Sequence, residues 1–142
     1  MYIGHVTPTI DILDACDHEQ VAFCRDPGAG YRAVIAIHST ALGPAVGGTR
    51  VWRYESLEAA TVDALRLARG MTYKNAMADV PLGGGKAVVL DDGEIADRER
   101  LFRAHGRFVD RFGGRFVTAE DVGTSPADMD MVRLETEHVA GL

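Results

Sequence analysis

Apolar residues in the first third of the chain alternate and cluster as they do in β-strands. Residues 20–25 (QVAFCR) and 31–39 (YRAVIAIHS) are rich in β-branched and aromatic side chains. Residues 26–30 (DPGAG) between them carry the proline and glycines of a turn. The pattern therefore predicts a β-hairpin. Residues 42–50 (LGPAVGGTR) contain three glycines and are predicted to form a loop.

The next segment has the period of an amphipathic helix. Ser56 is a suitable N-cap, because its hydroxyl can accept a hydrogen bond from the first turn. The helix is expected to end near Ala78, before Pro81. Its apolar stripe, at steps of three and four, consists of Leu57, Ala60, Ala64, Leu67, Ala68 and Met71.

Strands and helices alternate in the second half of the chain. Residues 86–90 (KAVVL) and 115–119 (RFVTA) are predicted strands, Asp97 caps the helix between them, and Ser125 caps a last helix. Such alternation favours an α/β fold with parallel strand pairs, while the opening hairpin adds an antiparallel pair. The predicted fold class is α/β, a three-layer domain with a mixed, largely parallel sheet flanked by helices.

Length, charge and cysteine content narrow the functional classes. The 142 residues, 46% of them hydrophobic, are typical of one globular domain, and a formal net charge of −6 counts against a nucleic-acid-binding protein. The sequence contains no run of about 18 apolar residues, so no membrane span is predicted. Residues 1–9 lack the basic and apolar regions of a signal peptide, so we expect a cytoplasmic protein. The spacing of Cys16 and Cys24 predicts free thiols.

Several familiar motifs are matched only in part. Residues 28–33 (GAGYRA) fit the dinucleotide pattern GxGxxA, but they open a strand instead of a helix and are interpreted as a hairpin turn. Residues 81–86 (PLGGGK) suggest a phosphate loop, yet Val80 and Ala87 replace the glycine and the hydroxyl residue that such a loop needs. The five histidines show no metal-ligand spacing, so no metal site is predicted, and His38 is expected to be a strand residue with a hydrogen-bonded ring.

The positive residues are unevenly divided between the two types. Of the 15 Lys and Arg residues, 13 are Arg, and only Lys74 and Lys86 are lysines. A lysine amine is compact and loses its proton readily when it is desolvated, whereas a guanidinium stays charged. The two lysines therefore mark positions where an arginine would not serve, unless codon bias alone produced the imbalance.

Three segments bring charged residues to positions typical of a binding site. Lys74 continues the apolar stripe of the predicted helix, so its amine either faces a cleft or extends outward to solvent. Lys86 follows three glycines and opens an apolar strand, where it would be partly desolvated. Asp121 follows a strand, at the edge of an α/β sheet where ligands usually bind. We expect the three to converge on one pocket, with the Gly47 and Gly48 backbone as a further wall.

Four motifs that include these residues resemble one known family. They are residues 43–52 (GPAVGGTRVW), 63–75 (DALRLARGMTYKN), 82–86 (LGGGK) and 118–124 (TAEDVGT), and the similarity spans roughly residues 20–142. The sequence resembles the N-terminal domain of the glutamate, leucine, phenylalanine and valine dehydrogenase superfamily, especially its leucine and phenylalanine branch. The resemblance implies reversible, NAD-dependent oxidative deamination of a branched-chain or aromatic L-amino acid to the 2-oxo acid and ammonia.

The resemblance also implies roles for individual residues. Lys74 would pair with the substrate carboxylate, and Lys86 would act as the base toward the water that attacks the imine carbon. Asp121 would exchange a proton with the substrate nitrogen. The residues expected to line the substrate site are Gly47 and Gly48, with Val46, Met71 and Ala119 as candidates for the side-chain pocket.

The same family implies a second domain and an assembly. Its members continue into a Rossmann domain that binds NAD, which we expect to be absent from this chain and supplied in cis or in trans. The chain is then an isolated domain of a longer enzyme, a separately encoded half, or a noncatalytic oligomerisation or amino-acid-binding module. The first hairpin carries apolar residues on both faces, which together with the family predicts a homo-oligomer. The apolar residues of this hairpin are Val21, Phe23, Val34, Ile35 and Ile37.

Overall fold

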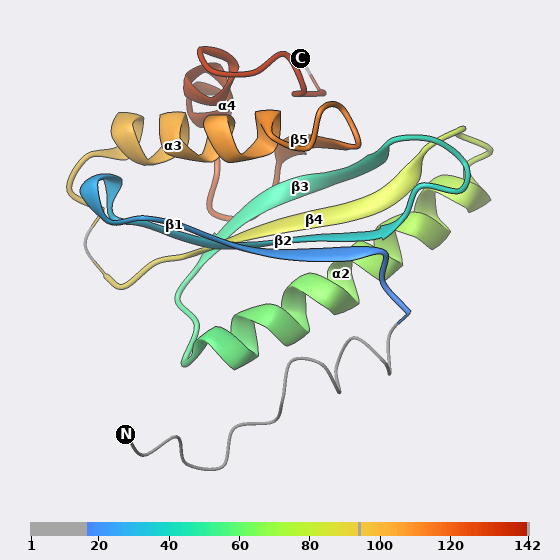
Figure 1. Cartoon of the computed structure of the whole chain (residues 1–142), viewed down its shortest axis with the longest axis horizontal. Helices are drawn as coiled ribbons and strands as arrows, with labels where there is room; N and C mark the ends of the chain where they lie inside the picture. Colours follow the sequence, from blue (N-terminus) through green and yellow to red (C-terminus); the bar gives the residue numbers. More distant parts are fainter. Residues whose placement is uncertain (1–16, 94, 142) are drawn as a thin grey trace.

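A sheet sandwiched between helices organises the chain. The structure is a computed structural model that describes residues 17–93 and 95–141. Helix α2 lies against one face of the sheet, and helices α3 and α4 lie on the other side (Figure 1), which confirms the three-layer α/β prediction. The elements are β1 Gln20–Asp26, η1 Pro27–Ala29, β2 Tyr31–Ser39, β3 Ala45–Trp52, α2 Leu57–Met77, β4 Gly83–Leu90, α3 Arg98–Asp110, β5 Phe116–Glu120 and α4 Pro126–Arg133.

The five strands are arranged in the order β1-β2-β4-β3-β5. Strand β2 pairs antiparallel with both β1 and β4, whereas β3 pairs parallel with both β4 and β5. Four of these strands therefore run in one direction and β2 runs in the other, so the predicted mixed, largely parallel sheet is confirmed. Helices α2 and α3 make the crossover connections that parallel neighbours require.

The first hairpin forms as the sequence predicts. Strands β1 and β2 pair along their whole length, from Gln20 opposite Ile37 to Asp26 opposite Tyr31. The short helix η1 makes the turn, and Gly30 closes it with φ of 63° in the left-handed region, which glycine adopts without strain. The predictions for residues 1–9 and for Cys16 lie outside the described residues.

The prediction of a loop over residues 42–50 holds for residues 42–44 and is wrong for residues 45–50. Residues 45–52 form β3, a strand paired on both sides. Its glycines serve close packing, because a Cβ on Gly47 would lie 1.6 Å from the carbonyl oxygen of Gly85 in β4. The glycines that were expected to precede the next strand likewise belong to β4, which begins at Gly83. Glycines that permit close approach resemble loop glycines in the sequence.

The helices begin at the residues that their capping signals indicate. The side chains of Ser56 and Asp97 accept hydrogen bonds from the first turns of α2 and α3. Ser125 and Asp128 form a reciprocal capping box at the start of α4. Helix α2 ends at Met77, next to the predicted limit at Ala78. Within the described residues, no helix is both long and apolar enough to cross a membrane.

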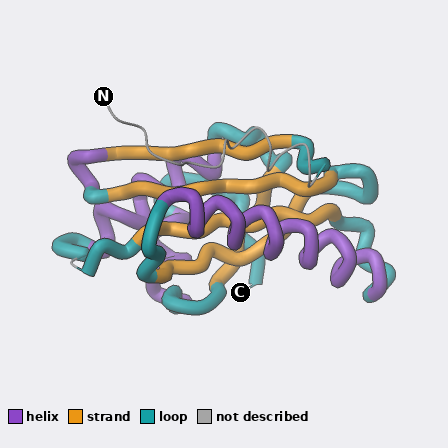
Figure 2. The backbone as a smooth tube through the Cα atoms, turned by 90° about the horizontal axis from the view of Figure 1, so that it is seen from below, coloured by secondary structure: helices purple, strands orange, loops and turns teal. Residues whose placement is uncertain are grey.

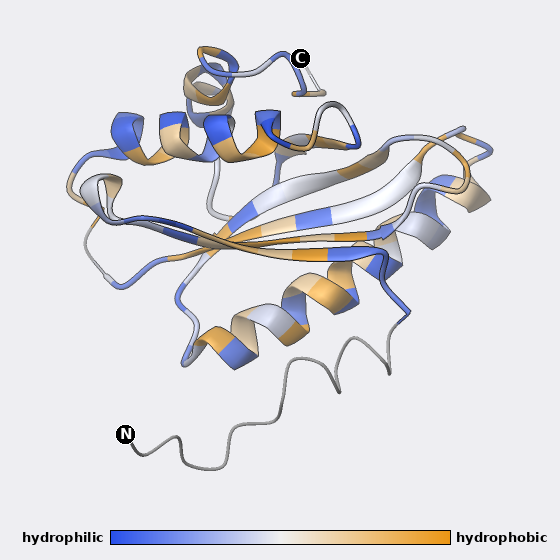
Figure 3. Cartoon of the chain, in the orientation of Figure 1, coloured by the Kyte–Doolittle hydropathy of each residue, from blue (hydrophilic) through white to orange (hydrophobic). Residues whose placement is uncertain are grey.

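Both faces of β2 are buried within the chain. Val34 and Ala36 pack with the alanines of α2, and Ile35 and Ile37 pack with the apolar residues of α3 and α4 on the other face. Figure 3 shows apolar residues along the sheet and on the helix sides that meet it. The argument that these β2 residues need a second copy to cover them is therefore wrong. Phe23 on the edge strand β1 remains 50% exposed.

Helix α2 covers only part of its face of the sheet. It packs mainly on β2 and β4. Figure 2, which views the sheet from the α2 side, shows strands beside the helix that the helix does not cover. From the strand order, the strands at this side of the sheet are β3 and β5. The residues of β3 and β5 that point to this side are thus left for a functional site.

Candidate active site

The structure brings Lys86 and Asp121 into direct contact. Lys86 lies in β4 and is 5% exposed, and its Nζ atom is 3.1 Å from Oδ2 of Asp121. Asp121 follows the last residue of β5, two strands away in the sheet. The contact joins a buried amine to a carboxylate at the carboxyl end of a parallel strand, where α/β proteins usually bind ligands.

Arg50 is a member of this centre that the sequence analysis missed. It lies in β3, between the other two strands, and its Nε atom donates a 2.8 Å hydrogen bond to the same Oδ2 atom of Asp121. Strand alternation places Arg50 on the same face as Gly48. The alternation of residues 46–50 is the signal in the sequence that places Arg50 on this face, and an interpretation of these residues as a loop conceals it.

The two cations keep Asp121 ionised. Burial raises the pKa of this carboxyl, but the hydrogen bonds from Arg50 and Lys86 and their positive charges outweigh burial, so its pKa lies below the ordinary aspartate value. An ionised carboxylate at this position can accept a proton from a bound substrate.

Lys86 experiences the opposite balance. Burial lowers the pKa of its amine, the hydrogen bond and charge of Asp121 raise it, and the Arg50 charge lowers it again. The result is a pKa below the ordinary lysine value, because the desolvated ammonium is not fully compensated by its partner. The amine therefore loses its proton more readily than that of an exposed lysine, as a general base requires.

Arg50 is held from a second side by helix α2. Its Nη1 atom lies 3.7 Å from Oδ2 of Asp63, the oxygen that accepts a 2.5 Å hydrogen bond from the Tyr54 hydroxyl. Arg66 donates a 2.6 Å hydrogen bond to the other oxygen of Asp63. These contacts fix the direction of the Arg50 guanidinium and join the sheet to α2 beside the Lys86–Asp121 pair.

The two predicted lining glycines lie in different surroundings. A Cβ on Gly48 would be 2.7 Å from the Asp121 Cβ atom, so Gly48 borders the charged centre. Gly47 is buried and faces the Gly85 carbonyl of β4, where the missing side chain lets the two strands approach. Its place in the wall of the substrate site stays a prediction.

The remaining predicted residues lie in β3, β5 and α2. Val46 in β3 and Ala119 in β5 are partly buried, and Gly48 pairs with Ala119 in the sheet. Met71 is partly buried on α2, and Lys74 is exposed near the end of that helix. Among the residues that the structure describes, the ion pairs of Lys86 and Asp121 do not include Lys74.

The glycine pattern of residues 28–33 does not provide a dinucleotide site. It lies in η1 and the start of β2, so it joins two strands as predicted. A dinucleotide loop needs a helix N-terminus to which the pyrophosphate can bind. The described residues therefore do not fit NAD at this motif.

Comparison with known proteins places these residues in a family. The profile of the Glu/Leu/Phe/Val dehydrogenase dimerisation domain matches residues 18–138. Leucine dehydrogenase of Geobacillus stearothermophilus is 56% identical over 130 residues, which are 92% of this chain and 35% of that protein. Valine dehydrogenase of Streptomyces coelicolor is 57% identical over 136 residues, which are 96% of this chain and 37% of that protein.

A solved structure agrees with these relatives. The crystal structure of L-tryptophan dehydrogenase from Nostoc punctiforme superposes with a TM-score of 0.88 and 48% identity, covering 93% of this chain and 39% of that one. The chain spans little more than a third of the length of these proteins. From the profile match and the identities, the chain belongs to the Glu/Leu/Phe/Val dehydrogenase family and corresponds to its dimerisation domain.

Proposed function

We propose that this chain binds the amino acid and carries out the proton transfers of an NAD-dependent L-amino-acid dehydrogenase. The reaction is the oxidative deamination of a branched-chain or aromatic L-amino acid to its 2-oxo acid and ammonia. The contact between the buried Lys86 amine and the Asp121 carboxylate carries this proposal. The names of the relatives, leucine and valine dehydrogenase, support the substrate class.

Each charged residue has a distinct task in this reaction. The exposed ammonium of Lys74 pairs with the substrate carboxylate. Lys86, whose pKa is lowered by burial, accepts a proton from the water that attacks the imine carbon. Asp121 takes a proton from the substrate nitrogen and returns it to the leaving ammonia. Arg50 holds the Asp121 carboxylate in place.

NAD accepts the hydride that leaves the substrate Cα, and we propose that a Rossmann domain holds it, in cis or in trans. This chain would supply one wall of the side-chain pocket through Val46, Met71 and Ala119, beside the Gly47 and Gly48 backbone. A second domain would supply the opposite wall, so the choice among leucine, valine and phenylalanine depends on both.

NMR spectroscopy of the chain with isotope-labelled lysine tests substrate binding directly. The chain contains only Lys74 and Lys86, so the spectrum has two lysine side-chain signals. We expect both lysine signals to shift when L-leucine or its 2-oxo acid is added, and neither to shift with NAD alone. The spectrum of Lys74→Arg assigns the two signals. Binding of NAD with micromolar affinity, or lysine signals that ignore every tested amino and 2-oxo acid, would contradict the proposal. Addition of a family Rossmann domain and NAD then tests for amino-acid-dependent formation of NADH.

A noncatalytic role in assembly is the second candidate, and the family's description as a dimerisation domain favours it. Strand β1 is an edge of the sheet, and Phe23 on it is half exposed, so a second copy could pair there. We expect sedimentation to show a homo-oligomer in either case. If leucine binds but no NADH forms with an added Rossmann domain, the binding module is the better description.

A further inference from the structure

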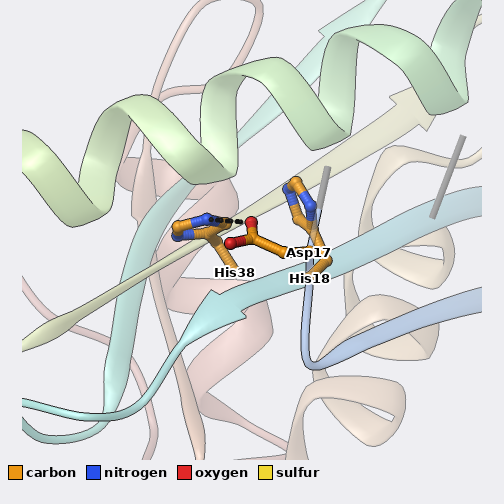
Figure 4. Close-up of side chains that lie close together, drawn as sticks. All are labelled: Asp17, His18 and His38. Carbon is orange, nitrogen blue, oxygen red and sulfur yellow. Dashed lines mark hydrogen bonds and ion pairs between the residues drawn. The ribbon is translucent and has the colours of Figure 1, made fainter. Parts of the chain in front are cut away.

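Three side chains of types that can bind a metal ion meet at the end of the sheet where β1 begins and β2 ends. Asp17 and His18 precede β1, and His38 is the last residue but one of β2. The amide of Glu19 donates hydrogen bonds to the carbonyl oxygens of Ile37 and His38, which fixes the two segments side by side. Figure 4 shows the Asp17 carboxylate directed at the His38 ring, with His18 beside it.

The ligand atoms of these residues are close to one another. One atom from each of Asp17, His18 and His38 lies within 4.8 Å of the other two. Oδ1 of Asp17 is 3.2 Å from Nε2 of His38, and the two imidazole rings meet edge to face with centroids 4.7 Å apart. The positions of the histidines in the sequence show no ligand spacing, because β-sheet pairing and not chain distance brings them together.

Helix α2 orients both rings. His18 Nε2 lies 2.8 Å from the carbonyl oxygen of Leu65, and a carbonyl can only accept, so this nitrogen carries the proton and Nδ1 carries the lone pair. His38 Nδ1 lies 2.8 Å from the Thr72 hydroxyl, which leaves Nε2 facing Asp17. A histidine that binds a metal commonly has its other nitrogen hydrogen-bonded to an oxygen, which fixes the ring and its tautomer.

We propose that Asp17, His18 and His38 form a binding site for a divalent transition-metal cation of the zinc type. Two imidazoles and one carboxylate are a donor set that zinc prefers, with bonds of roughly 2.0–2.2 Å and a fourth position left for water. Such bonds place neighbouring ligand atoms of a tetrahedral ion about 3.4 Å apart, close to the 3.2 Å between Asp17 and His38.

The remaining adjustment falls on a side chain that can move. The Asp17 side chain is 87% exposed, so it can rotate toward His18 without disturbing the core, and the ion can reach it from solvent. When the ion binds Nε2 of His38, the neutral ring takes the tautomer whose single proton lies on Nδ1, and this N–H donates to the Thr72 hydroxyl. The bound ion would link the segment before β1 to the end of β2, and both histidines contact α2. We therefore expect the ion to raise the thermal stability of the chain.

Calorimetric titration of the untagged, chelator-treated chain with Zn²⁺ tests the site. Thiols also bind zinc, so the parent for this experiment carries Cys16→Ser and Cys24→Ser. We expect one ion per chain, accompanied by a higher midpoint of thermal unfolding. Asp17→Asn should lower the affinity at least about tenfold. Because the Asp17 side chain is exposed, this substitution should leave the fold intact.

Further variants separate a built site from incidental binding. Thr72→Val removes the hydroxyl behind His38 and should lower the affinity about 10- to 100-fold, whereas Thr72→Ser keeps the hydroxyl and should retain it. His138→Gln, which alters a histidine placed against Gly114, should bind zinc like the parent. The proposal is overturned if the parent binds no stoichiometric ion, or if Asp17→Asn and His38→Gln both bind with unchanged affinity.

Discussion

Arg50 and Lys86 contact the same oxygen of Asp121, at 2.8 and 3.1 Å respectively. The carboxylate thus divides its charge between a guanidinium that never loses its proton and an amine that can. Arg50 weakens the hold of Asp121 on the Lys86 proton and adds its own positive charge nearby. Burial of the Lys86 amine, together with the Arg50 charge, therefore explains how one site contains an ionised carboxylate and a lysine with a lowered pKa.

Removal of the Arg50 charge should raise the pKa of Lys86. In Arg50→Gln, the cation that shares Asp121 with Lys86 is lost. The ammonium form of Lys86 then becomes more stable, because the nearby positive charge is gone and Asp121 interacts more strongly with Lys86. The measurement is a pH titration of the Lys86 side-chain NMR signal. Arg50→Lys, which retains a cation, should show a smaller rise. A Lys86 pKa that stays the same or falls in Arg50→Gln would contradict this account.

The two lysines should respond differently to arginine in a complete enzyme that carries this domain. Lys86→Arg replaces an amine that can be neutral by a group that cannot accept the proton, so kcat should fall about 10²- to 10⁴-fold. Lys74→Arg keeps a cation for the substrate carboxylate and should mainly raise KM. Steady-state kinetics with L-leucine measure both effects.

The pH profile of the same enzyme gives an independent check. In the parent, the plot of kcat against pH should show a group that titrates below the ordinary lysine range. This pH dependence should vanish in Lys86→Arg. Equal losses of kcat in the two variants, or near-normal turnover of Lys86→Arg, would show that the proposed division of tasks is wrong.

Two glycine-to-alanine substitutions should have opposite effects on stability. In Gly47→Ala the new Cβ would lie 1.6 Å from the Gly85 carbonyl oxygen, so β3 and β4 must separate and the chain should lose stability severely. Gly70 lies in α2, and among the described residues no atom other than those of its chain neighbours and its own helix backbone lies within 4 Å of its Cβ position. Gly70→Ala should therefore stabilise the chain by about 0.5–1 kcal/mol, because alanine restricts the unfolded chain. Denaturant unfolding of both variants decides the comparison.

The buried His105 should make stability depend on pH. Its ring is fully enclosed between the Tyr31 hydroxyl at 2.6 Å and the Thr49 hydroxyl at 2.7 Å, and burial lowers its pKa from 6.5 to about 3. Between these two values the unfolded chain binds one more proton than the folded chain. The free energy of unfolding should thus fall as the pH falls, by roughly 1.4 kcal/mol per pH unit from this residue.

Denaturant unfolding at about pH 6.5 and about pH 5 measures this slope, within the range where His105 titrates only in the unfolded chain. The substitution His105→Gln removes the titrating group and should make the slope smaller, even if it lowers stability at both pH values. In His138→Gln, the matched control, the His105 contribution should persist. Equal slopes in the parent and in His105→Gln would refute the assignment.

Local signals in the sequence determined the elements whose partners are near in the chain. The turn at Gly30 set the β1–β2 hairpin, and the hydroxyl and carboxylate caps at Ser56, Asp97 and Ser125 set the starts of the three helices. Capping and turn formation involve residues a few positions apart, so a single segment contains the whole signal. The scarcity of lysine similarly distinguishes Lys74 and Lys86 in the amino-acid composition alone.

The tertiary structure decided what depends on segments far apart in the chain. The sequence of β3 looks like a loop because its glycines, Gly47 and Gly48, are needed for close packing against Gly85 and Asp121, which are far away in the chain. Arg50 became a site residue only when β3 lay between β4 and β5, and the cluster of Asp17 and His38 arose from strand pairing with support from α2. These contacts depend on sheet order and register, which the hydrophobic period of one segment does not specify.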